Sequence, residues 1–321
     1  MGWRWTALAA AAVAGLLHAP PAPAQIGESY ARVSFYFAAH EDDWQLFMNP
    51  SAFHDVADGR TKTVFVHLTA GDAGLGTGTG GRKHPYYLAR ERGAESAIRF
   101  MADTRGYPGD RVVAPAKLNG HRLHRVRYRN TVAYFLRLPD GHGSGSGFAG
   151  TGHQSMERLA EGEIGALTPI DGSTIYRNWT DLVVTLRAIL DHERARAPLV
   201  EINVAELDPA LNPHDHSDHR MTARAALDAA QGLTCASRRH FVEYASARLP
   251  ENLSAEDREL EASVVAVTAA GILALDHPGI WQAYHRSYLG RNYFRFEPGS
   301  GHCDAPAPEV ASAAKRVQLK P

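Results

Sequence analysis

The sequence predicts an α/β fold in which helices flank a mainly parallel β-sheet. Short apolar runs typical of strands alternate along the chain with longer segments that have helical periodicity, and this alternation is typical of βαβ units. The chain has 321 residues, of which 44% are hydrophobic and 21% charged. It is therefore long enough to bury the sizeable core of a soluble globular protein.

Strands are expected where β-branched and aromatic residues cluster. Such runs lie at 32–39, 62–68, 130–138 and 199–207, with shorter ones at 111–118, 121–128 and 238–249. Helices are expected at 85–104, 179–197, 217–233 and 254–275, and residues 280–296 are helical or mixed. Ser254, with Asp257 three residues later, is a candidate N-cap, and Gly232 is a candidate helix stop.

The N-terminus has the pattern of a secretory signal peptide. Arg4 precedes an apolar stretch from Thr6 to Leu17 that is too short to span a bilayer, and Ala22-Pro23-Ala24 forms an A-x-A cleavage site. We therefore predict a signal peptide at 1–24, one domain at 25–297 and a loose, Pro-rich tail at 298–321. The mature protein is expected to be exported, either periplasmic or extracellular, without stable membrane insertion.

Cysteine count and charge narrow the possible environments and partners. Cys235 and Cys303 are the two cysteines of the chain, and an oxidising compartment favours one disulfide between them, with two unpaired thiols as the alternative. The formal net charge is −1, so no global electrostatic field favours binding to nucleic acid. The sequence does not define the oligomeric state.

Histidines and aspartates follow two of the predicted strands. His40 and Asp43 come directly after the first strand, and His216 and His219 follow the strand at 199–207 with the same spacing. Residues three apart lie on one side of a helix, and ligand sites in parallel sheets lie beyond the carboxyl ends of the strands. Two histidines and an aspartate with an open position form a hydrolytic zinc site, so we predict one Zn²⁺ per chain.

Further polar residues beside these pairs suggest how such a site would react. Asp42 adjoins Asp43 and could act as a general base on water without binding the metal. One of His214 and His216 could stabilise an oxyanion or protonate a leaving amine. Asp218 could orient a ligand histidine by contacting the ring nitrogen that does not bind the metal. The alternative for each motif is structural, since a strand-end Asp-Asp is often a helix N-cap with a solvated neighbour.

The motifs "AHEDD" (39–43) and "HSDH" (216–219) together resemble those of the PIG-L (LmbE-like) family, the N-acetylglucosaminyl-phosphatidylinositol de-N-acetylases and their bacterial relatives. That family has an AHPDDE-like motif after its first strand and an HPDH-like motif far downstream. The segments "VFVHLTAGDAG", "YYLARERGAES", "FLRLPDG" and "LPENLS" add to the likeness, which extends over roughly residues 33–275.

The resemblance implies a Rossmann-like fold, with the metal site at the carboxyl ends of the strands, and a zinc-dependent hydrolase that acts on the N-acetyl group of an amino-sugar conjugate. By motif position it implies these roles: His40, Asp43 and His219 as zinc ligands, Asp42 as general base, His216 as the group that stabilises the oxyanion, and Asp218 as support from behind. The alternatives are a carbohydrate-binding module without catalysis and a metal amidase for another N-acyl substrate.

Two positions depart from the family motif. Its proline is Glu41 here, which either adds negative charge near the metal or faces solvent, and its glutamate is Trp44. Trp44 could form a stacking wall for a sugar ring, but large aromatic residues usually pack internally, which favours burial.

Weaker signals concern the surroundings of the site. Arg92 resembles a family position near the substrate, with a solvated helix face as the alternative, and Asp140 could enter the site. The G-x-G-x-x-G match at 76–81 lacks an immediately following helix, so it does not predict a dinucleotide site. The Gly-rich loops at 76–81 and 140–153 are expected to be mobile, as a lid over the metal or as surface loops.

Overall fold

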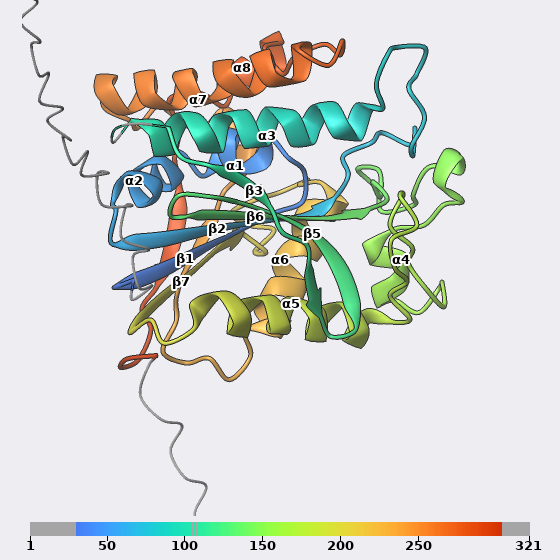
Figure 1. The fold of residues 1–321 in the computed structure, drawn as a ribbon. Coiled ribbons are helices and arrows are strands. Elements are labelled where there is room, and N and C mark those ends of the chain that lie inside the picture. The colour runs from blue at the N-terminus through green and yellow to red at the C-terminus, as the bar shows by residue number, and fades with distance from the viewer. Residues whose placement is uncertain (1–29, 105, 107, 304–321) are drawn as a thin grey trace, which may run out of the picture.

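The computed structural model describes residues 30–104, 106 and 108–303. The predicted signal peptide lies outside these residues. The described part of the chain forms an α/β fold with a nine-stranded, mostly parallel sheet between two layers of helices (Figure 1). This confirms the predicted fold class. No helix among the described residues is both long enough and apolar enough to cross a membrane.

The sheet has the strand order β3-β5-β6-β2-β1-β7-β8-β9, and β4 pairs with β5. Its strands are β1 (Arg32–Ala38), β2 (Thr61–Thr69), β3 (Arg111–Val113), β4 (Ala116–Leu118), β5 (His121–Tyr128), β6 (Thr131–Leu138), β7 (Leu199–Ala205), β8 (Ser237–Phe241) and β9 (Phe294–Glu297). The five central strands, β6-β2-β1-β7-β8, are parallel, and the remaining strands pair in antiparallel fashion. Taken in chain order, the parallel strands lie third, second, first, fourth, fifth. β1 is therefore the point from which the sheet grows in both directions.

The helices cover both faces of the sheet because the central strands are apolar on both. They are α1 (Asp43–Phe47), α2 (Ser51–Ala57), α3 (Tyr86–Asp103), α4 (Met156–Ala160), α5 (Trp179–Arg194), α6 (Ser217–Ala229), α7 (Ala255–Leu273) and α8 (Ala283–Arg286), with 3₁₀ turns η1 (Ala149–Thr151) and η2 (Tyr244–Arg248). In β1, Phe35 and Phe37 pack in the core beneath α5 and α6, whereas Tyr36 packs in the core beneath α3 and α7. Figure 1 shows these two helix pairs on opposite sides of the sheet.

Helices α3 and α7 cross closely at two glycines. A Cβ atom on Gly271 would lie 2.8 Å from the Cα atom of Gly93, so this approach excludes any larger residue at the crossing. Ser254 caps α7, as predicted, and its hydroxyl accepts the backbone N–H of Asp257. Near the middle of α7, Glu261 is fully buried and accepts the backbone N–H of Gly290 at 2.6 Å.

The C-terminal end of the described chain is held firmly. A disulfide joins Cys235 and Cys303, as the sequence favoured. The backbone N–H of Ser300 donates to the carbonyl of Thr234, and that of Cys303 donates to the carbonyl of Pro198. Residues 298–303 were predicted to be part of a loose tail, and in the structure these bonds and the disulfide attach Ser300 and Cys303 to the rest of the described chain. Residues 304–321 lie outside the described residues.

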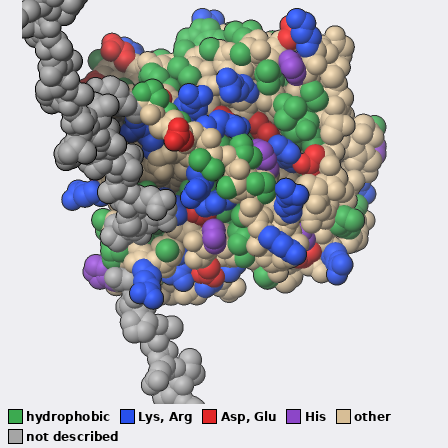
Figure 2. Space-filling view, viewed as in Figure 1, with side chains coloured by type: hydrophobic (Ala, Val, Ile, Leu, Met, Phe, Trp, Pro, Cys, Tyr) green, Lys and Arg blue, Asp and Glu red, His purple; other side chains and the backbone are tan. Residues whose placement is uncertain are grey.

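The surface carries a mixture of charges. Figure 2 shows basic and acidic side chains interspersed among apolar ones on the face seen in Figure 1. Many of these charges are paired, as in the Arg187–Asp191 and Arg194–Asp191 contacts on α5.

Candidate metal centre

Two neighbouring parallel strands bring the two predicted His/Asp motifs together. β1 ends at Ala38, and the chain then turns through His40 into α1, whose first residue is Asp43. β7 pairs directly with β1 and leads through a loop to α6, whose first turn contains His219. Because both strands run in the same direction, their carboxyl ends meet at one edge of the sheet.

The three predicted ligands converge on one point. His40 Nδ1 lies 3.4 Å from Asp43 Oδ1 and 3.3 Å from His219 Nε2, and His219 Nε2 lies 3.3 Å from Asp43 Oδ1. All three side chains are buried. These three atoms could hold a metal ion together.

The other atoms of these side chains are engaged by the surrounding protein. Asp43 Oδ2 accepts the backbone N–H of His40 at 2.7 Å, which leaves Oδ1 facing the two imidazoles. His219 Nδ1 lies 2.8 Å from Asp215 Oδ1 and 2.6 Å from Glu243 Oε2. Two carboxyl groups beside Nδ1 favour a proton there, which would leave the lone pair of Nε2 for a cation at the convergence point.

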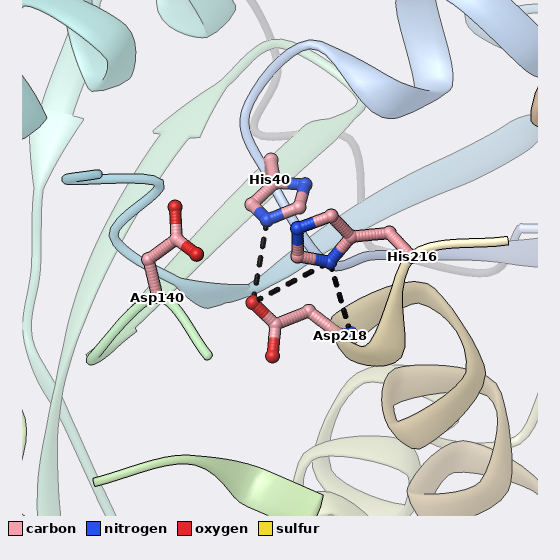
Figure 3. A group of neighbouring side chains, drawn as sticks. All are labelled: His40, Asp140, His216 and Asp218. Carbon is pink, nitrogen blue, oxygen red and sulfur yellow. Dashed lines mark hydrogen bonds and ion pairs between the residues drawn. The ribbon is translucent and has the colours of Figure 1, made fainter. Parts of the chain in front are cut away.

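His40 and His216 both contact Asp218, as Figure 3 shows. His40 Nε2 lies 3.4 Å from Asp218 Oδ2, and the same oxygen accepts the backbone N–H of Gly141 at 2.8 Å. His216 Nδ1 accepts the backbone N–H of Asp218 at 3.1 Å, so this histidine caps α6. Asp140 lies on the other side of His40 in Figure 3 and belongs to the same group of possible metal ligands.

The electrostatic field at the convergence point favours positive charge. Burial lowers the pKa of His40, but the charge of Asp43 and contacts with Asp218 outweigh burial and raise that pKa well above its ordinary value. Burial acts likewise on His219, where Glu243, Asp43 and Asp215 outweigh it and raise the pKa. Burial raises the pKa of Asp43, yet the two imidazoles lower it well below its usual range. Such surroundings suit a cation.

Asp42 sits beside the centre and is held by an arginine. The Arg90 guanidinium, on α3, donates from Nη2 to Asp42 Oδ1 and from Nε to Glu41 Oε2 at 2.9 Å. Glu41 is buried, which excludes the alternative that it faces solvent, and burial raises its pKa to about 8 despite the opposing charge of Arg90. Arg90 therefore restricts the orientation of the Asp42 carboxylate.

A cavity of about 240 Å³ opens over the centre. Its lining combines acids, imidazoles and aromatic rings: His40, Asp42, Asp43, Leu46, Phe47, Gly71, Ala73, Tyr86, Arg90, Asp140, His216, Tyr244, Tyr284, His285 and Tyr288. A larger cavity of about 350 Å³ lies at the opposite ends of the strands, around Lys62 and Glu193, and none of the candidate ligands lines it.

The weaker sequence predictions fare differently. Trp44 is fully buried and donates from Nε1 to His67 Nε2 at 3.1 Å, so it packs internally and forms no wall of the cavity. Arg92 is exposed and does not line the cavity, whereas Arg90 does. His214 is exposed, whereas His216 lines the cavity. Asp140 lines it too.

The two Gly-rich loops lie beside the centre and against each other. Gly141 bonds to Asp218, and the backbone N–H of Ser217 donates to the carbonyl of Gly143. A Cβ atom on Gly76 would lie 3.9 Å from Thr151 Cγ2, so the two loops are in contact. Their expected mobility remains a prediction.

Four kinds of residue at the centre were not predicted from the sequence. Asp215 lies between His214 and His216, and Glu243 follows the end of β8 by two residues. The strand-end position of Glu243 is the signal that could have identified it. Arg90 and the tyrosines of the cavity follow no motif.

Comparison with protein-family models, with curated proteins and with solved structures finds no match to this chain. The family resemblance of the two motifs therefore remains an expectation.

Proposed function

We propose that this chain is an exported zinc-dependent hydrolase that removes the N-acetyl group of an amino-sugar conjugate. The observation that carries the proposal is the mutual separation of 3.3–3.4 Å between His40 Nδ1, Asp43 Oδ1 and His219 Nε2. Nitrogen and oxygen ligands about 2.0–2.1 Å from a tetrahedral zinc lie about 3.3–3.4 Å apart. On the side of these three atoms that faces the cavity, the fourth coordination position of the zinc would remain open to a substrate.

The fold and the motifs support the choice of reaction. The order of the five parallel strands supports a doubly wound, Rossmann-like sheet, in which the metal centre would lie beyond β1 and β7, where the order reverses. The spacing of His40 and Asp43, and of His216 and His219, matches the PIG-L-like motifs. Amide hydrolysis and the sugar substrate come from that resemblance.

Zinc, when bound, supplies a Lewis acid that polarises the amide carbonyl and lowers the pKa of water. Asp42 would accept the proton of the attacking water at Oδ2, because Arg90 occupies its Oδ1. Glu41 and Tyr86 also bond Arg90, so the guanidinium holds Asp42 in one orientation.

His216 would stabilise the oxyanion, and the proton that Asp42 accepts from the water would pass to the leaving amine. Its Nδ1 accepts the backbone N–H of Asp218, so a neutral imidazole carries its proton on Nε2. Desolvation lowers the pKa of His216, as do the neighbouring His40 and His219, which favours the neutral form. This form donates a hydrogen bond from Nε2.

The Cys235–Cys303 disulfide supports export, because disulfides persist in oxidising compartments.

The test combines metal analysis with acetate release from N-acetylglucosamine conjugates. Asp42→Ala is expected to retain zinc and lose activity, whereas His219→Ala is expected to lose both. Asp110→Ala, an exposed acid outside the centre, is the matched control and should retain both. Undiminished turnover by Asp42→Ala would disprove the base assignment. Glycan binding and zinc without acetate release by the wild type would favour a carbohydrate-binding module, and release only from other N-acyl compounds would favour a general amidase.

A further inference from the structure

Three tyrosines form one wall of the cavity over the centre. Tyr244 belongs to η2, Tyr284 belongs to α8, and Tyr288 follows α8; we call these three residues the tyrosine wall. The rings of Tyr244 and Tyr288 are stacked, with centroids 5.8 Å apart and planes at 14°. Tyr244 also meets the His219 ring edge-on at 4.9 Å. The wall is therefore anchored directly on a candidate ligand.

The hydroxyl groups of the wall are available to a ligand. No hydrogen bond to the described part of the chain involves the hydroxyl of Tyr244, Tyr284 or Tyr288, whereas the Tyr86 hydroxyl accepts from Arg90. Tyr244 is 38% exposed and Tyr284 is 57% exposed. Aromatic faces combined with unused hydroxyls suit a ring that has both apolar faces and polar edges, as a sugar does.

The same cavity offers no free cationic side chain. Arg90 is the sole arginine or lysine among the described residues that line it. Each of its three nitrogens already has a partner: Nε contacts Glu41, Nη2 contacts Asp42, and Nη1 contacts Tyr86. The lining carboxyl groups of Asp42, Asp43 and Asp140 offer an anion no partner either, since Asp42 is paired with Arg90 and Asp43 would hold the zinc. An anionic group on a substrate would therefore lose its hydration at the tyrosine wall without gaining an ion pair with an arginine or lysine.

We propose that the cavity selects an uncharged sugar next to the N-acyl group and rejects phosphate, sulfate or carboxylate substituents there. The tyrosine wall determines this specificity by stacking on the neutral ring and bonding its hydroxyls. The proposal rests on the proposed function, because it concerns the substrate of the same centre. Beyond that function, it specifies the charge of the preferred substrate and the residues that recognise the substrate.

The test uses the full-length zinc-loaded protein, with N,N′,N″-triacetylchitotriose and its 6-O-sulfated form as probes. One proton NMR sample measures both acetate release and saturation transfer to the glycan, so binding is recorded whether or not turnover occurs. We expect saturation transfer to the neutral glycan and about tenfold lower kcat/KM for the sulfated one, since the sulfate would lose its hydration without gaining an ion pair. Equal or better use of the sulfated glycan would overturn the proposal.

Two substitutions at one exposed position sharpen the test. Tyr284→Ala should weaken binding of the neutral glycan by about two- to tenfold, because a stacking contact is lost. The effect should appear as a higher KM and not as a lower kcat. Tyr284→Lys should shift the preference towards the sulfated glycan, because it adds the missing cation. Phe296→Ala removes an equally exposed aromatic ring outside the cavity and is the control.

The outcomes separate this inference from the proposed function. Neutral-glycan binding that depends on Tyr284, without acetate release, would support the inference and count against the hydrolase. If the rate of acetate release changes neither with sulfation of the glycan nor with substitution of Tyr284, the result would support the hydrolase and refute the inference. Absence of saturation transfer to either glycan would also refute the inference.

Discussion

Glu261 provides a pH-dependent test of the fold that is independent of the metal centre. The residue is fully buried in α7, where Gly290 donates its backbone N–H to Oε2, and Oε1 has no hydrogen-bond partner among the described residues. Burial raises the pKa of this carboxyl from 4.5 to about 8, and the Gly290 bond and Arg291 only partly oppose this. The folded protein therefore holds a proton on Glu261 at neutral pH.

The sign of the effect follows from proton linkage. Between pH 4.5 and 8 the folded state binds more protons at Glu261 than the unfolded state, so its contribution to the free energy of unfolding falls as pH rises. At about 1.36 kcal/mol per pH unit, the loss is about 3 kcal/mol by pH 7 and at most ~5 kcal/mol above pH 8. Glu261→Gln removes this loss, since glutamine imitates the protonated acid.

The assay is urea unfolding of wild type and Glu261→Gln at several values between pH 4.5 and 9. The difference in free energy of unfolding should be near zero at pH 4.5, should grow in favour of the variant up to pH 8, and should then level off. Glu259→Gln, at an exposed site on the same helix, should give no such pH-dependent difference. A pH-independent difference for Glu261→Gln would refute the reasoning.

Three further predictions concern the disulfide and the metal centre. Replacing Cys235 and Cys303 by alanine should lower the free energy of unfolding by about 4 kcal/mol, as expected for a bridge across 68 residues, and denaturant titration without reductant measures this. Glu243→Gln should weaken zinc affinity by roughly 10- to 100-fold, because one carboxylate on His219 Nδ1 is lost, and chelator competition would detect it. Arg90→Ala should lower kcat for acetate release by freeing Asp42, whereas Arg92→Ala should match the wild type, and equal rates for both variants would contradict the role of Arg90.

Much of the fold could be predicted because the central strands are locally distinctive. The runs at 32–39, 62–68 and 199–207 are buried on both faces, and this burial produces continuous apolar stretches. The edge strand β9 was harder to identify. Its alternation of Phe and charged residues would predict a strand with one buried face, but the segment is short and both phenylalanines are exposed.

The candidate site shows the same division between local and long-range information. His40, Asp43 and His219 have short motif spacings at strand ends, and the sheet brings them together. Arg92 was chosen instead of Arg90 because the phase of α3 against the sheet cannot be read from the motif alone. Residues two apart on a helix are rotated by about 200° around its axis. An error of two positions therefore selects the exposed Arg92 instead of Arg90, which lines the cavity.

His40 and His219 are 179 positions apart in the chain, and only the pairing of β7 beside β1 makes them neighbours. A partly folded intermediate that lacks this pairing would have His40 and Asp43 together but not His219, and would bind trace metal ions weakly. If the chain binds a metal ion as we propose, ion capture would then be among the last events of folding and would draw on the metal supply of the compartment in which the sheet forms.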